Sequence, residues 1–269
     1  MNTMSEFNPA GKLFPENNEK MNIPPRKPEQ DEIFNPTEAR QYLGCDTEKT
    51  ADYAIVAGEI GLAFGEKNRL HGETIVEVCF GPGNLCGELL KIGAGHVIGI
   101  DGSPIMIEHA QEKFKKEVAK GTMEFHLGHA QSLSIPDNSV DGIVNFNSFH
   151  QFSTIDRATD ALREMARVLK PGGWGFIRDF RRDTDPHKLD GRNTNPDIDK
   201  LLQDSLPAAF TKKEFEDMLL HVNSIEFFVT NAPDPWRLPE SICKHIRQDP
   251  VRHWMDAAVS QHVIFKKIT

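Results

Sequence analysis

Two carboxylates and a glycine turn are the first residues in this chain whose types and spacing could do chemistry. The stretch VEVCFGPGN places Glu77 inside an apolar run typical of a buried strand, and the run breaks at Gly81 and Gly83. A second acid, Asp101, ends the next apolar run, HVIGID. Glycines let the backbone approach a ligand, and an acid at a strand end can accept both hydroxyls of a ribose. The pair of acids therefore predicts a site for an adenosine that carries a cationic, amine-bearing tail.

The same turn lacks the features of a phosphate site. A dinucleotide site requires Gly-x-Gly-x-x-Gly, so that the pyrophosphate sits on the helix N-terminus, but the third position here is Cys86. A P-loop requires a Lys-Ser/Thr pair after its glycines, and none follows. The ligand predicted at this turn is therefore not held by a phosphate.

A second group of candidates follows two later apolar runs. The loop NSFHQF carries His150, which could orient or deprotonate a substrate or only hydrogen-bond its own loop. The run RDFRRD carries Arg178 and Arg181, one of which is expected to hold a substrate carboxylate or phosphate, unless the arginines pair with the neighbouring aspartates. Tyr53 lies on a predicted helix, where it is either a lid contact or ordinary packing.

An alternation of strands and helices must position these groups. Apolar runs predict seven strands, at residues 74–80, 96–101, 123–127, 140–147, 174–180, 224–230 and 262–268. Helical patterns are predicted at residues 47–64, 85–92, 104–120, 153–169 and 211–222, with Ser103 and Ser153 at two of the helix starts. This rhythm predicts an α/β fold, with a largely parallel sheet covered by helices on both faces.

The pattern also predicts the domain organisation. Residues 1–45 are expected to be a loose N-terminal arm or a strap laid over the domain, because their Asn-, Pro- and Lys-rich start can bury little. Residues 46–269 are expected to form a single domain with lid segments at about 183–210 and 232–257. The second lid carries four residues that could roof a substrate or contact a second copy: Trp236, Arg237, His253 and Trp254.

Composition narrows the class of protein. The chain has 269 residues and a net charge of −9, which opposes nucleic-acid binding because a phosphate backbone needs a basic footprint. No run approaches the roughly 18 apolar residues that cross a bilayer, and the N-terminal residues lack a signal-peptide pattern. We therefore expect a cytoplasmic protein. The eleven histidines and four cysteines show no ligand spacing, so no metal site is predicted.

Four stretches in order resemble the class I S-adenosylmethionine-dependent methyltransferases: VEVCFGPGN, VIGIDGSPIMIEHAQ, GHAQSLSIPDNSVDGIV and ALREMARVLKPGG. The resemblance covers about residues 47–180 and is greatest to the small-molecule group that includes the ubiquinone and menaquinone C-methyltransferases. It implies a Rossmann-like, doubly wound sheet of seven strands, mostly parallel with the last strand antiparallel. It also implies S-adenosyl-L-methionine as cofactor and a small, polar or anionic methyl acceptor.

The resemblance implies roles for individual residues. Glu77 would engage the methionine amino end, Asp101 the ribose hydroxyls, Met106 the adenine face and Ala130 the adenine edge. His150 matches a position often held by His in a loop that faces the transferred methyl. The whole implied cofactor set is Tyr53, Glu77, Gly81, Gly83, Asp101, Gly102, Met106, His129, Ala130 and Asn147.

Two departures from the family pattern leave other functions open. The family usually has Gly where Cys79 stands, and it has an adenine-binding Asp where His129 stands; His129 or Gln131 could accept that bond instead. These changes keep a non-catalytic or repurposed cofactor-binding relative as one alternative. A protein or RNA methyltransferase is another, although the acidic charge opposes RNA and the stretch NFNS replaces the Asn-Pro-Pro-Tyr signature of amino-group methylation.

Overall fold

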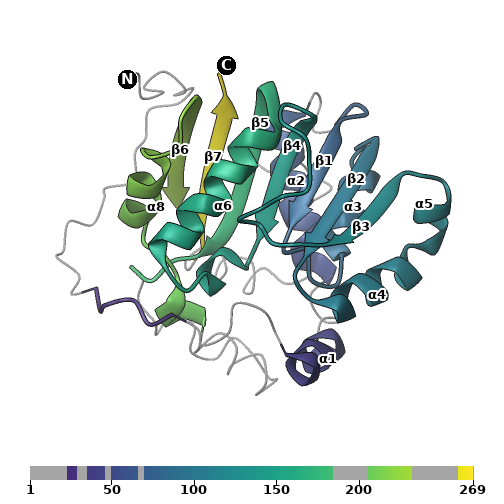
Figure 1. Ribbon diagram of the computed structural model, residues 1–269, viewed down its shortest axis with the longest axis horizontal. Helices are drawn as coiled ribbons and strands as arrows, with labels where there is room; N and C mark the ends of the chain where they lie inside the picture. The colour runs from purple at the N-terminus through teal and green to yellow at the C-terminus, as the bar shows by residue number, and fades with distance from the viewer. Residues whose placement is uncertain are drawn as a thin grey trace.

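A seven-stranded sheet forms the centre of the molecule. The computed structural model describes residues 23–28, 35–45, 50–65, 70–183, 205–231 and 260–268. The strand order is β3-β2-β1-β4-β5-β7-β6 (Figure 1). The strands are β1 (Thr74–Val78), β2 (His96–Asp101), β3 (Met123–Leu127), β4 (Val140–Phe146), β5 (Leu169–Phe180), β6 (Ile225–Asn231) and β7 (Ser260–Lys267).

Strand direction confirms the predicted fold class. The pairs β1–β2, β1–β4, β2–β3 and β4–β5 are parallel, whereas β7 is antiparallel to both β5 and β6. The strand order reverses between β1 and β4, which is where open α/β sheets bind ligands at the carboxyl ends of their strands. Both acids singled out in the sequence belong to β1 and β2, next to this reversal.

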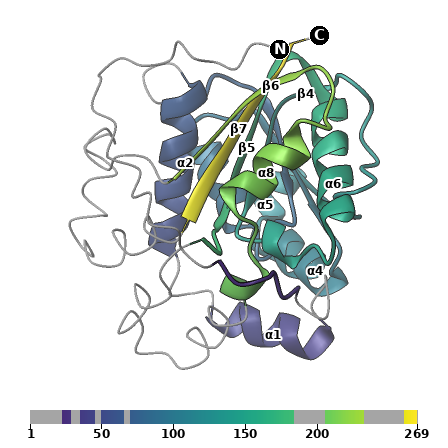
Figure 2. The ribbon, with the colours of Figure 1, turned by 90° about the vertical axis from the view of Figure 1, so that its left-hand side faces the viewer.

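Helices cover both faces of the sheet. Figure 2 shows α2 on one side of the sheet and α6 and α8 on the other. The helices are α1 (Pro36–Cys45), α2 (Thr50–Phe64), α3 (Asn84–Lys91), α4 (Pro104–Lys113), α5 (Lys115–Ala119), the 3-10 turn η2 (Phe149–Gln151), α6 (Ile155–Val168) and α8 (Lys212–Leu219). None of the helices within the described residues is long and apolar enough to cross a bilayer.

Alternate residues of each central strand face opposite layers. Ile75 of β1 packs with α2, α3 and α4, whereas Val76 and Val78 pack with α6 and α8. Burial of such a side chain contributes about 1.5–3 kcal/mol. Packing of this kind holds α3, which has 8 residues, whereas an isolated helix needs roughly 12–15 residues to be even marginally stable. Strands buried on both faces read as continuous apolar runs, which is why the sequence predicts them well.

The helix predicted at 104–120 is broken at Phe114 into α4 and α5, which corrects the prediction. Phe114 has φ −109° and ψ 26°, outside the helical region. A Cβ built on Gly83 or Gly87 would lie 3.2 or 3.0 Å from the Phe114 ring, so this ring fits closely against the two glycines. Packing of one aromatic side chain therefore overrides the local helix pattern.

Two further boundaries differ from the prediction. The N-cap of α6 is Thr154 instead of Ser153, and its side chain accepts a hydrogen bond from Arg157 N. β5 begins at Leu169, before the Lys-Pro-Gly-Gly turn, and its register with β4 shifts between Val140 and Gly142. The predicted strand at 174–180 is thus the second part of a longer, irregular strand.

Parts of the predicted arm contact the domain. Lys27 N donates to Pro207 O at 3.0 Å, and Ala39 of α1 is fully buried. For these residues the structure agrees with the strap alternative, and the domain boundary at residue 45 stays a prediction. Most of the predicted lids at 183–210 and 232–257 lies outside the described residues, and so do four residues of interest: Trp236, Arg237, His253 and Trp254.

Candidate active site

The glycine turn after β1 leaves space beside its backbone. Gly81 and Gly83 have φ values of +56° and +75°, in the left-handed region that glycine adopts at little cost. Among the residues that the structure describes, a Cβ built on Gly81 would approach only the Tyr42 ring, at 4.0 Å, so this part of the chain leaves the Gly81 backbone open to a ligand. Gly83 instead lies against Phe114, so the two glycines of the motif serve different purposes.

Asp101 connects the end of β2 to the glycine turn. Its Oδ2 accepts a hydrogen bond from Gly81 N at 2.9 Å, and its Oδ1 accepts one from Ser103 N at 2.9 Å. Removal from water raises the pKa of Asp101 above its ordinary value, and the bonds from Ser103, Gly81 and Gly102 N–H groups partly oppose this rise. A carboxylate held in this way shapes the turn and presents its oxygens at the carboxyl edge of the sheet.

Glu77 lies in the core beneath the turn and is only 2% exposed. Its Oε2 accepts a hydrogen bond from Cys86 Sγ at 2.9 Å. Burial raises the pKa of Glu77 to about 8, the Cys86 hydrogen bond lowers it in part, and the charge of Asp101 raises it further. The pKa of Cys86 is also raised, by burial and by the charge of Glu77. Glu77 is therefore largely protonated at neutral pH in the ligand-free protein.

Two residues at the same edge adopt the left-handed region without being glycine. Cys79 has φ +55° in the turn, and Asn147 has φ +50° directly after β4. A Cβ in this region costs roughly 1–2 kcal/mol, although Asn tolerates it better than other residues. Cys79 thus adopts a backbone region that glycine favours.

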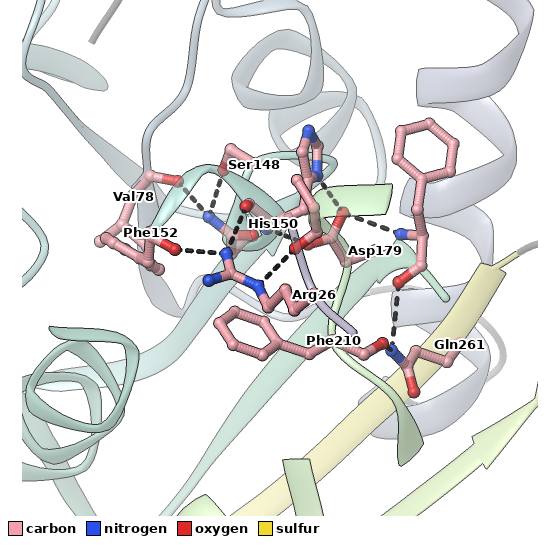
Figure 3. Close-up of polar contacts among 11 residues, drawn as sticks. Arg26, Val78, Ser148, His150, Phe152, Asp179, Phe210 and Gln261 are labelled. Carbon is pink, nitrogen blue, oxygen red and sulfur yellow. Dashed lines mark hydrogen bonds and ion pairs between the residues drawn. The ribbon is translucent and has the colours of Figure 1, made fainter. Parts of the chain in front are cut away.

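His150 and Asp179 form a buried pair at the ends of β4 and β5. The exposed fraction is 2% for His150 and 0% for Asp179. His150 Nδ1 lies 2.7 Å from Asp179 Oδ1, and His150 N donates to Asp179 Oδ2 at 2.6 Å (Figure 3). A carboxylate at Nδ1 assigns the imidazole proton to that atom, so Nε2 carries the lone pair.

Asn145 connects this pair to the glycine turn. The side chain is fully buried, and its Nδ2 donates to Val78 O at 3.0 Å and to Ser148 Oγ at 2.7 Å. Val78 is the last residue of β1, and Ser148 precedes η2, which contains His150. The glycine turn and the His150 loop are therefore held against each other at the strand-order reversal.

Arg178 lies on the opposite face of β5, under α2. Its Nη1 is 3.6 Å from Glu59 Oε2, and its guanidinium lies 5.8 Å from the centre of the Phe146 ring. His262 Nε2 also lies within 3.1 Å of Glu59 Oε2. All three polar side chains are at most 5% exposed, and within the described residues Arg178 Nε and His262 Nδ1 have no hydrogen-bond partner. Unpaired buried polar atoms are uncommon and mark a site where a ligand can supply the missing bond.

Comparisons with known proteins agree with this geometry. The Methyltransferase domain family matches residues 75–173. The chain is 27% identical over 202 residues to the ubiquinone/menaquinone biosynthesis C-methyltransferase UbiE of Escherichia coli (strain K12 / DH10B), a match that covers 74% of this chain and 70% of the relative. Residues 75–173 thus match a methyltransferase domain, and the chain as a whole is similar to the class I S-adenosylmethionine-dependent methyltransferases.

Solved methyltransferase structures share the fold. The plantazolicin methyltransferase BpumL in complex with SAH superposes with a TM-score of 0.64 at 16% identity, covering 87% of this chain and 91% of BpumL. A putative S-adenosyl-L-methionine-dependent methyltransferase from Methanococcus maripaludis superposes with a TM-score of 0.62 at 19% identity. The match covers 92% of this chain and 98% of the Methanococcus maripaludis protein. Likeness at these identities shows the fold, and the site rests on this chain's own residues.

S-adenosyl-L-methionine is the cofactor of this methyltransferase, and the carboxyl edge fits it. The turn at Gly81 has open space, and Asp101 presents a carboxylate beside it. Asn145 Oδ1 and Asn147 Oδ1 are buried acceptors without a hydrogen-bond partner in the described parts of the chain. Acceptors of this kind suit a ligand that brings ammonium and hydroxyl donors.

The other predicted site residues of the methyltransferase lie as follows. Met106 and Ala130 are buried, at 2% and 4% exposure, and His129 is exposed in the loop after β3. Tyr53 packs edge-on against Phe146, with ring centres 5.5 Å apart, so packing accounts for its position. Arg181 is paired with its neighbour through an Nε–Oδ1 distance of 3.0 Å to Asp183. The cofactor and transfer roles of all these residues stay predictions.

Three polar residues around His150 and Arg178 have contacts that the sequence did not predict. Asp179 was considered only as a partner for the arginines, yet it binds His150. Glu59 and His262 were not considered, although they surround Arg178. Strand alternation could have separated Asp179 from Arg178, because neighbouring residues of a strand point to opposite faces. No local pattern could have paired Glu59 with His262, which are 203 residues apart.

Proposed function

We propose that this methyltransferase transfers the methyl group of S-adenosyl-L-methionine to a small, polar or anionic acceptor, and that His150 accepts the acceptor's proton. The observation that carries the proposal is the buried His150–Asp179 pair at the carboxyl ends of β4 and β5. When bound, the cofactor supplies a methyl group on a sulfonium centre, which an acceptor atom attacks in line.

The pair has the properties of a general base. Asp179 Oδ1 also accepts a bond from Phe180 N at 2.8 Å, so three N–H donors hold this carboxylate. A fixed carboxylate orients the imidazole and stabilises the imidazolium that forms when Nε2 takes up a proton. The acceptor's electron pair would bond to the methyl carbon while the methyl–sulfur bond breaks and leaves its electron pair on the sulfur as a neutral thioether. The proton displaced from the acceptor would pass to His150 Nε2.

Arg178 supports the anionic character of the acceptor. Its side chain is 4% exposed, and the distance from its Nη1 to Glu59 Oε2 is 3.6 Å, longer than a hydrogen bond. The unpaired Nε–H of Arg178 is a charge-assisted donor that a carboxylate or phosphate on the acceptor could engage. We propose Arg178, and not Arg181, as the arginine that holds the acceptor, because Arg181 is already occupied by Asp183.

The relatives support a small-molecule acceptor. UbiE is named as a C-methyltransferase of ubiquinone and menaquinone biosynthesis, and BpumL as a plantazolicin methyltransferase. The net charge of −9 opposes an RNA acceptor. A cytoplasmic location stays a prediction.

The test uses cofactor labelled on its methyl group, mixed with the purified protein and an extract of the source cells, followed by separation of small molecules, protein and RNA. His150→Gln should reduce labelling of the small-molecule fraction by about 10²–10⁴-fold, the usual contribution of a general base. His96→Gln is the matched control. His96 Nε2 also lies 3.1 Å from a carboxylate oxygen, Glu124 Oε1, but His96 is at the amino end of β2, away from the carboxyl edge. Asp101→Ala serves as the cofactor-binding control.

Each outcome decides one part of the proposal. Label in small molecules that is lost with His150→Gln and kept with His96→Gln supports it. Label in protein or RNA overturns the acceptor class. Cofactor binding without any transfer overturns the activity and favours a non-catalytic relative.

A further inference from the structure

A short segment from the N-terminal part of the chain lies against the transfer site. Residues 23–28 run below the carboxyl edge of the sheet (Figure 2). Within this segment, the Arg26 guanidinium donates to four main-chain carbonyls. Nε donates to Ala208 O at 2.6 Å, Nη1 to Ser153 O at 3.1 Å, and Nη2 to His150 O at 2.8 Å and to Phe152 O (Figure 3).

Further contacts fix the segment in place. The Arg26 guanidinium stacks over the Phe210 ring at 4.1 Å, and Lys27 N donates to Pro207 O at 3.0 Å. Arg182 Nε donates to Pro24 O at 3.0 Å, while its Nη2 donates to Glu214 Oε1 at 2.8 Å. The strap, residues 23–28, is therefore attached both to the His150 loop and to the residues that precede α8.

Arg26 completes the support of His150. Asp179 holds the backbone N–H and Nδ1 of His150, and Arg26 holds its carbonyl. The two contacts come from opposite sides of the loop, as Figure 3 shows. The carbonyl dipoles stabilise the partly buried guanidinium of Arg26. Because its N–H donors have a fixed, planar geometry, the guanidinium in turn holds these carbonyls in one arrangement.

We infer that Arg26 is a positioning residue for methyl transfer: it fixes the His150 loop so that the His150–Asp179 pair keeps the geometry needed to accept a proton. This inference rests on the proposed function. It assigns the N-terminal strap a role in holding the His150 loop and none in cofactor binding. A displacement of about 1 Å at such a group costs about 100-fold in rate.

The first arm of the test needs no acceptor. The downfield proton resonance of the His150 Nδ1–H group is recorded by NMR on the full chain and assigned with His150→Gln. Arg26→Ala should broaden or abolish this resonance, and millimolar guanidinium chloride should restore it where sodium chloride at equal concentration does not. Arg26→Lys keeps the charge but not the planar set of donors, so we expect it to fold and still to lose the sharp resonance.

Arg167→Gln is the matched control. The Arg167 guanidinium also binds two loop carbonyls, Leu133 O and Ile135 O, each at 2.9 Å, but near the C-terminus of α6. It should leave the His150 resonance unchanged. A resonance that is unchanged in both Arg26 variants, or lost equally in Arg167→Gln, overturns the inference.

The second arm measures transfer from labelled cofactor at saturation. Arg26→Ala should lower transfer about 100-fold, while the cofactor Kd from calorimetry stays that of the wild type. A weakened cofactor Kd with normal transfer at saturation overturns the positioning role. If the wild type transfers no methyl at all, the proposed function fails by itself, and the NMR arm still decides the role of Arg26.

Discussion

At the carboxyl edge, the half predicted to bind the cofactor (the cofactor half, around the glycine turn) and the half proposed for methyl transfer (the transfer half, around His150 and Arg178) are built from contacts of different range. In the cofactor half, the partners Glu77 and Cys86 are 9 residues apart, and Gly81 and Asp101 are 20 apart. In the transfer half, Arg26 reaches Ala208 across 182 residues, and Glu59 reaches His262 across 203. The glycine turn and its two acids are thus formed by a single strand-helix-strand unit, whereas Asn145, which bonds to Val78 across 67 residues, and the contacts of Arg26 and Glu59 need more of the sheet.

Because their contacts differ in range, each half of the site can change without altering the other. A local unit keeps its geometry as long as its own strands pair, so the cofactor site can be shared widely within the fold. Loops attached to distant segments can move or be replaced without altering that unit. We therefore expect substitutions in one half to leave the function of the other intact.

Breaking the transfer half at Asp179 should have the largest effect. Asp179→Asn places an amide where three N–H donors now meet a carboxylate. We expect methyl transfer to fall by about 10²–10⁴-fold, with the cofactor Kd unchanged by calorimetry. Asp183→Asn, which alters the Arg181 pair instead, is the control. A large change in cofactor Kd in Asp179→Asn would show that the two halves are not independent.

Breaking the cofactor half at Asp101 should have the next largest effect. Asp101→Ala removes the acceptor of the Gly81 and Ser103 N–H groups as well as the expected ribose contact. The two charge-assisted bonds expected from the ribose hydroxyls to Asp101 are worth about 3 kcal/mol or more. Their loss should raise the cofactor Kd by about 100-fold. Asp141→Asn is the control, since Asp141 accepts a bond from Thr74 N at 2.9 Å at the opposite edge of the sheet. Equal losses in both variants would indicate general destabilisation.

The pH dependence of cofactor affinity tests whether Glu77 contacts the cofactor ammonium. Burial raises the pKa of its carboxyl to about 8, and the predicted contact with the cofactor ammonium requires the ionised form. We expect the affinity to rise by about tenfold per pH unit up to about pH 8 and then to level off. Calorimetry in buffers of different ionisation enthalpy should detect the released proton. Glu77→Gln should remove the dependence, and persistence of the dependence in that variant would contradict the assignment.

The same pKa predicts how stability changes with pH. The folded protein keeps Glu77 protonated up to about pH 8, whereas the ordinary pKa of this carboxyl is 4.5. The unfolded chain therefore loses its proton first as the pH rises. The contribution of Glu77 to the free energy of unfolding should fall between pH 4.5 and about 8, and not rise. Urea titrations of wild type and Glu77→Gln across this range measure the contribution as their difference.

The smallest effect is expected at Cys79, the strained residue of the turn. Cys79→Gly should be more stable than Cys79→Ala by about 1 kcal/mol, because glycine relieves the cost of φ +55°, partly offset by its greater freedom in the unfolded chain. Urea unfolding of the two variants measures this difference. An equal stability would mean that the turn relaxes when the thiol is removed.

The cofactor half could be predicted from the sequence for a physical reason. Buried parallel strands require continuous apolar runs, and a backbone that passes close to a ligand requires glycine, so each constraint marks the residues that satisfy it. Glu77, Gly81 and Asp101 follow from such marks and from the resemblance to the class I methyltransferases. His150 was predicted from its place in the loop after the fourth predicted strand and from the resemblance, which often has His at this position.

By itself, then, the sequence determined the seven strands, the glycine turn and the pair of acids, because each depends on neighbouring residues. Only the tertiary structure decided that Asp179 binds His150, that Glu59 and His262 surround Arg178, and that Arg26 supports the transfer loop. It also decided the break at Phe114, where packing against two glycines outweighs helix propensity. Contacts between residues far apart in the chain leave no periodic pattern, since either partner alone looks like an ordinary polar residue until folding brings the two together.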